Sequence, residues 1–414
     1  MPYDSPFRYE GQTLCCESVA LADIAARIGT PCYVYSATDI IGRYRAYDRA
    51  LDGLPHEICY AVKANSNLSV LRLLAAAGSG FDIVSGGELF RVLRAGGDPN
   101  KIVFSGVGKT AEEIEYAIRE RIHSFNCESD EEIDLIDALS GRAGVRSRVS
   151  LRVNPDVDAV THPYISTGLR EHKFGIDIAE IEHVYARAAH MPNLAVEGIS
   201  CHIGSQLLQA APMMEAIDRM LELIERLRNS GVPPAHLDLG GGLGVRYRPD
   251  ETAPCIEDYA RAIGERVRGR DLHILVEPGR SVVGEAGVLL MRVLYRKRTA
   301  RKEFVVVDAA MNDLLRPALY EAHHEILPVR RRDEQMVADV VGPVCESADF
   351  LARDRTMASV FPGDLLAVST AGAYGFVQSS NYNSRPRAAE VLVESDQWRV
   401  IRKRETYEDL VRGE

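Results

Sequence analysis

The sequence predicts an α/β fold, a closed (β/α)8 TIM-type barrel that binds its ligand at one end, together with a second, mostly β domain of the sandwich or barrel type. The first observation is an alternation of short apolar runs and stretches of helical period between residues 57 and 280, which is typical of parallel strands joined by helices. The second observation is that there are eight such runs, because eight strands make a barrel whose interior side chains fill the lumen. The third is that this alternation ends after Gly284, where strand-like runs follow one another without long helices.

Each barrel strand is predicted from a β-branched or apolar run that stops at a turn. The eight runs cover residues 57–63, 80–85, 101–105, 122–126, 147–154, 196–202, 235–240 and 272–277. Helices are expected over residues 67–77, 86–95, 111–120 and 212–229, and a further helix over 38–51 precedes the first strand. The barrel is therefore expected to occupy residues 34–284.

The β domain is predicted from strand-like runs beyond the barrel. These runs cover residues 287–295, 304–307, 336–341 and 364–368. Residues 1–33 are assigned to the same domain from their position alone, so the domain is expected to be discontinuous, formed by residues 1–33 and 285–414.

Composition excludes several classes of partner. The 49 Lys and Arg residues against 60 Asp and Glu residues give a formal net charge of -11, which argues against a nucleic-acid or anionic membrane surface. The first four residues lack the basic and apolar pattern of an export signal, and no apolar run is long enough to span a membrane. The eight cysteines are scattered without a Cys-x-x-Cys pair, so we expect reduced thiols in a cytoplasmic protein and no zinc site.

Polar residues and glycines stand where the predicted strands end, which is where enzymes of this barrel class build their active sites. These residues are Lys63, Asp82, Ser85, His202, Gly240, Gly241, Gly242, Glu277, Gly279 and Arg280. Lys63 follows an apolar run, and burial would disfavour its ammonium and free a nucleophilic amine suited to a Schiff base with an aldehyde. A lysine paired with a carboxylate is the alternative.

The glycine run at residues 240–242 exposes backbone N–H groups that could hold a phosphate, although a tight turn between a strand and a helix would explain it too. Arg280 and Ser205, near the ends of the neighbouring eighth strand and of the sixth strand, favour the phosphate. Glu277 ends an apolar strand and needs a cationic partner, either a pyridinium nitrogen or an arginine such as Arg280. His202 has no second ligand at metal-binding spacing, so we expect a ring stacked on a cofactor or a core histidine, and no metal.

Four ordered motifs together resemble the fold type III decarboxylases that use pyridoxal 5′-phosphate and share an alanine racemase-like barrel. The motifs are residues 60–65 (YAVKAN), 202–206 (HIGSQ), 240–242 (GGG) and 277–280 (EPGR). The resemblance implies that Lys63 forms the Schiff base with the cofactor, that His202 stacks on its ring and that Glu277 contacts its pyridine nitrogen. It also assigns other residues to cofactor binding: Asp82, Ser205, Gly241, Gly242, Gly279 and Arg280.

The C-terminal half narrows the resemblance to the diaminopimelate decarboxylase family, through residues 311–320, 342–349, 372–375 and 383–387. That family implies that Arg280, Arg316 and Tyr320 hold the substrate, while Tyr374 contacts both substrate and cofactor phosphate. Two arginine forks suit a substrate with an extra carboxylate. Glu346 is expected to recognise the distal amine and Cys345 to supply the proton, although a small apolar thiol is the alternative for Cys345.

The resemblance implies an activity and an assembly. The activity is conversion of meso-2,6-diaminopimelate to L-lysine and carbon dioxide, the last step of bacterial lysine biosynthesis, with loss of the carboxylate at the D-centre. The assembly is a homodimer in which Cys345, Glu346 and Tyr374 reach into the partner's site.

Four other functions compete with this interpretation. A decarboxylase of ornithine, arginine or carboxynorspermidine would share Lys63, His202 and Glu277. The presence of Arg316, Tyr320 and Glu346 argues against it. A non-catalytic protein that binds pyridoxal phosphate would be a barrel alone. An alanine racemase would need a tyrosine base from its second domain, and a barrel enzyme without the cofactor would show no Schiff-base absorption.

Overall fold

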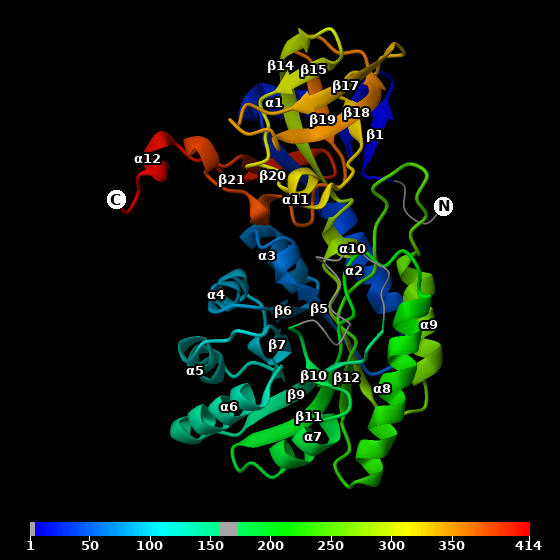
Figure 1. The fold of residues 1–414 in the computed structure, drawn as a ribbon, viewed down its shortest axis with the longest axis vertical. Coiled ribbons are helices and arrows are strands. Elements are labelled where there is room, and N and C mark those ends of the chain that lie inside the picture. Colours follow the sequence, from blue (N-terminus) through cyan, green and yellow to red (C-terminus); the bar gives the residue numbers. More distant parts are fainter. Residues whose placement is uncertain (1–4, 158–172) are drawn as a thin grey trace. The chain divides into compact units, whose positions relative to one another are not determined.

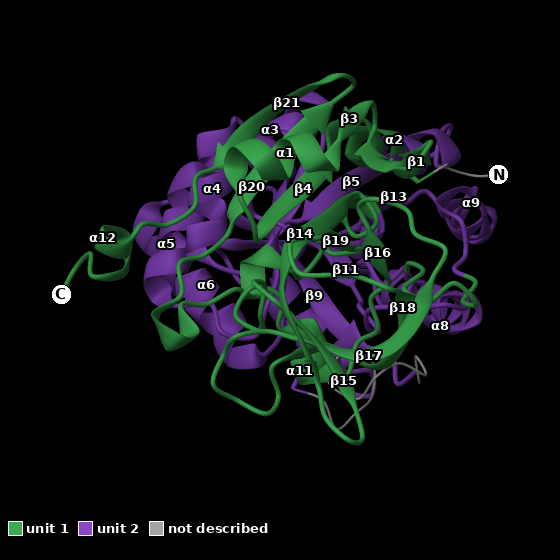
Figure 2. Cartoon of the chain, turned by 90° about the horizontal axis from the view of Figure 1, so that it is seen from above, with its two compact units in different colours: residues 1–42, 245–252, 282–414 green, residues 43–244, 253–281 purple. Residues whose placement is uncertain are grey.

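The computed structural model describes residues 5–157 and 173–414, so the first four residues, at which no export signal is expected, lie outside the described chain. The chain divides into two compact units, shown in different colours in Figure 2. Unit 1 contains residues 1–42, 245–252 and 282–414, and unit 2 contains residues 43–244 and 253–281. The domain boundaries placed at residues 34 and 284 stay a prediction.

Unit 2 is built on a closed barrel of eight parallel strands (Figure 1). The strands are β5 (His56–Ala61), β6 (Gly80–Ile83), β7 (Ile102–Phe104), β8 (Ser124–Cys127), β9 (Ser147–Asn154), β11 (Leu194–Ser200), β12 (His236–Asp238) and β13 (His273–Val276). They pair in the order β9-β11-β12-β13-β5-β6-β7-β8, and β8 pairs with β9 to close the barrel. The predicted barrel is therefore confirmed, and a short strand β10 (Ile176–Asp177) adds to the end of β9.

Capping residues in the loops after β6, β7 and β8 mark where the next helices begin. The helices of the barrel region are α2 (Ala37–Ala50), α3 (Leu68–Ala76), α4 (Gly86–Ala95), α5 (Ala111–Glu120), α6 (Asp130–Ala143), α7 (Ile181–Ala189), α8 (Ala211–Asn229) and α9 (Ile256–Val267), with short 3-10 turns η1 (Val62–Ala64) and η2 (Pro99–Lys101). Ser85, Thr110 and Ser129 each accept a bond from the third backbone N–H of the helix that follows. These caps satisfy N–H groups that the helix itself cannot pair.

Parallel pairing brings the carboxyl ends of the strands to one end of the barrel. Asp82 lies beside Ala61 on the neighbouring strand, and Asp238 lies beside both Ser200 and Leu275. The backbone N–H of Ala61 also bonds the carbonyl of Pro278, at 3.1 Å. The strand-end residues of the sequence are thus gathered at this end of the barrel.

Unit 1 is mostly β, as predicted. Its strands are β1 (Phe7–Glu10), β2 (Thr13–Cys16), β3 (Val19–Ala20), β4 (Cys32–Ser36), β14 (Gly287–Arg298), β15 (Glu303–Val307), β16 (Ile326–Pro328), β17 (Gln335–Val341), β18 (Phe350–Ala358), β19 (Leu365–Val368), β20 (Ala389–Glu394) and β21 (Gln397–Arg402). The remaining elements are short: α1 (Leu21–Ile28), α11 (Arg316–Tyr320), α12 (Tyr407–Leu410), η3 (Phe376–Gln378), η4 (Tyr382–Ser384) and α10 (Arg280–Val283), whose first two residues belong to unit 2.

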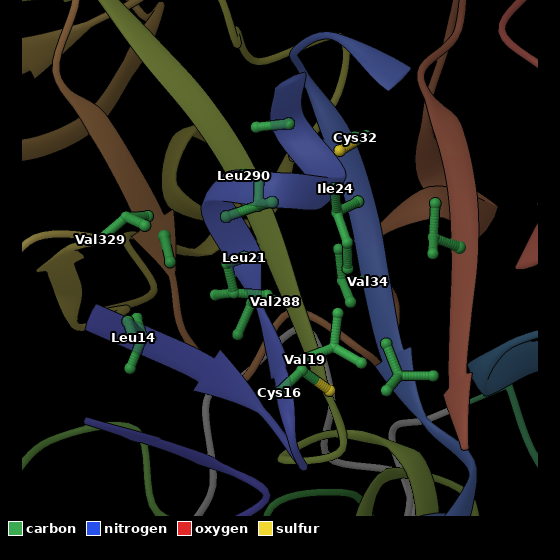
Figure 3. Close-up of a cluster of buried hydrophobic side chains, with 14 of the residues drawn as sticks. Leu14, Cys16, Val19, Leu21, Ile24, Cys32, Val34, Val288, Leu290 and Val329 are labelled. Carbon is green, nitrogen blue, oxygen red and sulfur yellow. The ribbon is translucent and has the colours of Figure 1, made fainter. Parts of the chain in front are cut away.

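The core of unit 1 joins residues from both ends of the chain. Strand β4 pairs antiparallel with β14 and parallel with β20, so an N-terminal strand lies in the middle of the larger sheet. The side chains of Leu21, Ile24, Val34, Val288 and Leu290 pack together in one buried cluster (Figure 3). Burial of these apolar side chains holds the N-terminal segment to the C-terminal sheet. Among the described helices of the chain, none is long and apolar enough to cross a membrane.

Candidate active site

Lys63 and Asp82 form the first contact at the strand ends of unit 2. Lys63 lies in the η1 turn directly after β5, and its Nζ donates a hydrogen bond to Oδ2 of Asp82 at the end of β6. The Asp82 side chain is fully buried, whereas that of Lys63 remains 34% exposed. The other carboxylate oxygen of Asp82 has no hydrogen-bond partner in the described chain. Lys63 is thus paired with a carboxylate and still reachable by a small molecule.

Glu277 follows β13 and is buried beside other acids. Its Oε1 accepts hydrogen bonds from Ser105 Oγ at 3.3 Å and Asn126 Nδ2 at 3.4 Å. Burial, and then the charges of Asp238 and Asp82, raise the pKa of Glu277 well above its usual range. A carboxyl group in this environment favours a protonated form or a cationic ligand.

Arg280 and Ser205 are brought together, and Arg280 does not serve as the partner of Glu277. Nε and Nη2 of Arg280 donate to Ser205 Oγ at 3.2 and 3.0 Å. Arg280 is only 5% exposed, and in the described part of the chain Glu277 has no ion pair with it. The two residues therefore offer a cation and a hydroxyl side by side, a combination that suits a phosphate or carboxylate.

The glycine run turns sharply against the neighbouring strand end. A Cβ atom at Gly241 would lie 2.4 Å from the backbone oxygen of Glu277, and Gly242 has a φ of +118° that side chains rarely permit. A Cβ at Gly279 would lie 2.9 Å from the Cβ of Ala64. Glycine thus allows a close approach of the backbone to its neighbours, which leaves a lining without side chains.

His202 is held as a neutral ring. Its Nδ1 accepts a hydrogen bond from the backbone N–H of Gly241 at 3.2 Å. Burial lowers the pKa of His202 well below its usual value, and the positive charges of Arg152 and Lys63 act in the same direction. A neutral ring that accepts at Nδ1 carries its proton on Nε2. Across the described residues, no three His, Cys, Asp or Glu side chains are grouped as metal ligands.

Three further polar residues at the same end were not singled out from the sequence. Asn126 Nδ2 contacts Ser105 Oγ at 3.0 Å and Asp238 Oδ2 at 2.9 Å, and all three side chains are buried. Ser105 and Asn126 end the third and fourth predicted strands, and Asp238 stands two residues before the glycine run. The rule that found Lys63 and Glu277, a polar residue at a strand end, would have found Ser105 and Asn126 as well, whereas Asp238 lies inside the predicted run 235–240.

An ion pair and a second acid border this group. Arg152 Nη1 lies 2.7 Å from Glu128 Oε1, and both side chains are largely buried. Glu88, in the first turn of α4, bonds the backbone N–H of Val84 at 2.8 Å. Burial raises the pKa of Glu88 to about 7, although the hydrogen bond from Val84 and the charge of Lys63 oppose the shift.

Arg316 is a buried predicted residue of unit 1 that contacts several neighbours. It is 6% exposed, and its Nε donates to Nε2 of His324 at 3.3 Å. Its guanidinium lies 4.9 Å from the ring centre of Tyr247 and 5.7 Å from that of Tyr320. Arg316 and Tyr320, which were each predicted to hold the substrate, thus lie in contact. Tyr247 and His324 were not predicted.

Cys345 and Glu346 lie on an exposed loop. Asp349 holds this loop by accepting from the backbone N–H of Val344 at 2.7 Å. The backbone N–H of Cys345 donates to Asn383 Oδ1 at 2.8 Å, and Cys345 is the exposed member of the eight free cysteines. Its side chain is therefore exposed, and its role as the proton donor stays a prediction.

Glu346 and Tyr374 complete the predicted residues. Glu346 accepts a hydrogen bond from the hydroxyl of Tyr382 at 2.7 Å and is otherwise exposed. Tyr374 is partly buried and has a φ of +54°, an unusual conformation for a bulky residue. Such backbone strain is found most often where a side chain must be aimed at a ligand.

Comparison with known proteins identifies what this arrangement resembles. Residues 37–284 match the family model described as the pyridoxal-dependent decarboxylase, pyridoxal binding domain. A diaminopimelate decarboxylase of Pseudomonas aeruginosa is 59% identical over 99% of this chain and 98% of its own, and one of Vibrio cholerae is 53% identical over 98% and 97%. The crystal structure of diaminopimelate decarboxylase from Helicobacter pylori complexed with L-lysine is 44% identical, has a TM-score of 0.91, and matches over 94% of this chain and 98% of its own.

Proposed function

This chain belongs to the diaminopimelate decarboxylases within the pyridoxal-dependent decarboxylase family, and on that premise we propose how its residues release carbon dioxide from meso-2,6-diaminopimelate to form L-lysine. The reaction is the last step of bacterial lysine biosynthesis. The main support for these roles is that a partly exposed Lys63, a neutral His202 and the buried carboxyl group of Glu277 lie together at one end of the barrel.

The residues at this end fit pyridoxal 5′-phosphate. Arg280 and Ser205 present a cation and a hydroxyl, and Gly241, Gly242 and Gly279 leave a lining without side chains, as a phosphate requires. Asp82 has an unpaired oxygen beside Lys63. When bound, the cofactor supplies an aldehyde for an amine and a ring that accepts the electrons released with carbon dioxide.

The barrel residues divide the work around the cofactor. Lys63 presents an amine nucleophile that Asp82 holds in place. Glu277 places a proton at the pyridine nitrogen, because its buried carboxyl favours the un-ionised form or a cationic neighbour. His202 is uncharged and can lie against the ring without repelling its positive nitrogen.

The predicted residues of unit 1 provide the substrate contacts. Arg316 and Tyr320, together with Arg280 of the barrel, are assigned to the carboxylates, because an arginine fork binds a carboxylate through two parallel bonds. Glu346 is assigned to the distal ammonium and Tyr374 to both substrate and cofactor phosphate. Cys345, which is exposed, returns a proton to the carbon that has lost its carboxylate.

We also propose that the chain works in the cytoplasm as a homodimer in which Cys345, Glu346 and Tyr374 serve the partner's barrel. What supports the shared site is that Cys345 and Glu346 are exposed in the single chain, although chemistry on a carbon requires exclusion of water. The eight free cysteines agree with a reducing compartment.

Mixing two inactive variants tests the shared site. Lys63→Ala and Cys345→Ser should each be almost inactive alone. Random exchange of subunits makes half of the dimers mixed, and one site of two in each mixed dimer is intact, so we expect about a quarter of wild-type activity after mixing. Mixed variants that stay inactive although mass spectrometry shows subunit exchange would contradict the shared site.

A substrate panel tests the assigned reaction. The purified chain with pyridoxal 5′-phosphate should release carbon dioxide from meso-diaminopimelate with a kcat/KM at least about a hundredfold above that for L-ornithine, L-arginine or carboxynorspermidine, because only the first offers a second carboxylate to Arg316. Equal or faster release from any of the other three would overturn the assignment of substrate.

A further inference from the structure

Three buried carboxylates meet at the strand ends, and Lys63 is the cation that the described residues place beside one of them. Asp82, Asp238 and Glu277 are 0%, 1% and 7% exposed. Lys63 pairs with Asp82. Among the described residues, neither Asp238 nor Glu277 has a lysine or arginine within ion-pair distance. Two neighbouring buried carboxylates without a cation cannot both be ionised at low cost.

The hydrogen bonds around the pair come from uncharged donors. Asp238 accepts from the backbone N–H of Gly240 at 2.9 Å and from Asn126 Nδ2 at 2.9 Å. Glu277 accepts from the same Asn126 nitrogen at 3.4 Å and from Ser105 at 3.3 Å. Asp238 is thus bonded at both of its oxygens, whereas the donors of Glu277 converge on a single oxygen, Oε1. The donor set therefore stabilises Asp238 as the anion of the pair and leaves Oε2 of Glu277 to carry a proton.

Electrostatics point to the same division. Burial, followed by the charges of Asp238 and Asp82, raises the pKa of Glu277 well above its usual range, and the hydrogen bond that Glu277 shares with Asp238 adds to the shift. Burial also raises the pKa of Asp238, but hydrogen bonds from Gly240, Asn126 and Glu277 lower it. The shared bond acts in opposite directions on the two acids, as expected when Glu277 donates and Asp238 accepts.

The other titratable groups that face the pair do not replace this proton. Lys63 lowers the pKa of Glu277, but its ammonium is already bonded to Asp82. Cys59 and Cys201 are kept as neutral thiols, since burial and the charge of Asp238 raise the pKa of each. His202 is neutral because burial and nearby cations lower its pKa.

From this arrangement we propose that Asp238 is a positioning residue that keeps one proton on Glu277 before the cofactor binds. The inference rests on the proposed function, in which Glu277 faces the pyridine nitrogen. Glu277 then brings its own proton: its O–H bond breaks, an N–H bond forms on the nitrogen, and the carboxylate left behind stays bonded to Ser105 and Asn126. No proton has to be taken from the solvent at this position.

Proton counting on ligand binding tests the proposal without measuring catalysis. The probe is pyridoxine 5′-phosphate, which lacks the aldehyde and therefore cannot form a Schiff base with Lys63. Calorimetric titration of the full-length, cofactor-free chain in two buffers of different ionisation enthalpy gives the number of protons taken up at pH 8. Asp238→Asn removes the negative charge and replaces one of the two acceptor oxygens by an NH2 donor, so it favours the ionised form of Glu277. We expect this variant to take up more protons than the wild type, by up to about one per site.

A matched substitution controls for changes common to all variants. Asp137 is a partly buried acid on α6 that accepts a hydrogen bond from the backbone N–H of Asn193. It does not belong to the group of residues around Asp238 and Glu277. Asp137→Asn should take up the same number of protons as the wild type. Equal proton uptake by Asp238→Asn and the wild type would overturn the proposal and leave Asp238 a purely structural residue.

Infrared spectroscopy of the cofactor-free chain gives a second readout. We expect a band of an un-ionised carboxyl group at pH 8 in the wild type and in Asp137→Asn, and its loss in Glu277→Gln and Asp238→Asn. Glu277→Gln keeps the test decisive if Asp238→Asn does not fold. Absence of the band in the wild type would refute the shared proton. If the band is present but neither pyridoxine 5′-phosphate nor pyridoxal 5′-phosphate binds, the proposed function fails while the shared proton stands.

Discussion

At the scale of single residues, the orientation of Arg316 depends on the tautomer of one histidine. His324 is fully buried, and its Nδ1 donates to the backbone oxygen of Ser369 at 2.9 Å. Its Nε2 is then free of hydrogen and accepts from Arg316. The Tyr247 ring lies against both side chains, 5.1 Å from the His324 ring centre. Arg316 is therefore held before any substrate arrives.

Replacement of Arg316 by lysine should weaken substrate binding. A lysine keeps the charge but cannot bond His324, stack on Tyr247 and present a fork to a carboxylate at the same time. We expect Arg316→Lys to raise KM for meso-diaminopimelate about tenfold, or about 1.4 kcal/mol, with a smaller change in kcat. Arg332→Lys, at an arginine bonded to Asp364, is the control and should leave KM unchanged. Wild-type KM in Arg316→Lys would argue against a role in substrate binding.

Strand-end residues could be predicted from the sequence to different degrees. Lys63 and Glu277 each end a strongly apolar run. The sequence alone therefore indicates that a charged group is buried there at a cost in free energy. Asp238 was harder to find because its apolar run continues through Leu239 into the glycines. Its contact with Asn126, 112 positions away, depends on barrel closure. His324 and Tyr247 gave no signal, since neither lies in a predicted strand.

At the scale of elements, the glycine turn after β12 is the part of the site that leaves least room for side chains. Gly241 approaches the backbone oxygen of Glu277, so the turn and the end of β13 are in direct contact. The backbone N–H of Glu277 bonds the oxygen of Gly240 at 2.7 Å. A change in this turn therefore moves both the phosphate lining and Glu277.

Gly241→Ala should weaken cofactor binding. Its Cβ would lie 2.4 Å from a backbone atom, which cannot move aside as a side chain could. We expect an affinity for pyridoxal 5′-phosphate at least about tenfold lower, together with a lower melting temperature. Fluorescence titration and thermal unfolding measure the two effects. Gly108→Ala is the control, since a Cβ there meets nothing within 4 Å. Unchanged affinity in Gly241→Ala would show that the turn does not hold the phosphate.

The sequence predicted the strands and helices of the barrel better than the pairing of strands in unit 1. Buried parallel strands are recognised in a sequence as short apolar runs. Capping residues such as Ser85 and Thr110 mark where helices begin. The two-residue strand β10 was not predicted because so short a segment has no period. The pairing of β4 with β14 and β20 joins positions more than 250 residues apart, which no local pattern specifies.

At the scale of the whole molecule, the barrel separates its reactive end from an end that governs stability. His236 and His273 begin β12 and β13, and His123 stands just before β8, so all three lie at the amino ends of the strands. The rings of His123 and His236 are 5.8 Å apart, and Nε2 of His236 has no partner in the described chain. Burial, with the charges of Arg148 and the other histidines, lowers the pKa of His123 to about 4 and that of His236 to about 3.

These histidines should make the fold sensitive to acid. Their pKa in the folded chain lies below the value of about 6.5 in an unfolded chain, so the unfolded state binds more protons below that pH. The stability associated with neutral histidines is complete above pH 6.5 and is lost as the pH falls towards 4, by about 1.4 kcal/mol per pH unit for each. Urea unfolding at pH 7.5, 6 and 5 measures this loss.

The matching variant replaces both rings. A His123→Gln/His236→Gln chain should lose less stability between pH 7.5 and pH 5 than the wild type, even if it is less stable at pH 7.5. An unchanged dependence on pH would show that other groups control acid unfolding.

Lys63 is the residue on which decarboxylation by this chain depends most. The decisive measurement is the formation of L-lysine and carbon dioxide from meso-diaminopimelate with pyridoxal 5′-phosphate, in the wild type, in Lys63→Ala and in Lys101→Ala, whose lysine pairs with Glu57 elsewhere in the barrel. We expect equal amounts of the two products from the wild type and Lys101→Ala, and a rate at least about a thousandfold lower from Lys63→Ala. Undiminished lysine formation by Lys63→Ala, or none by the wild type, would contradict the account.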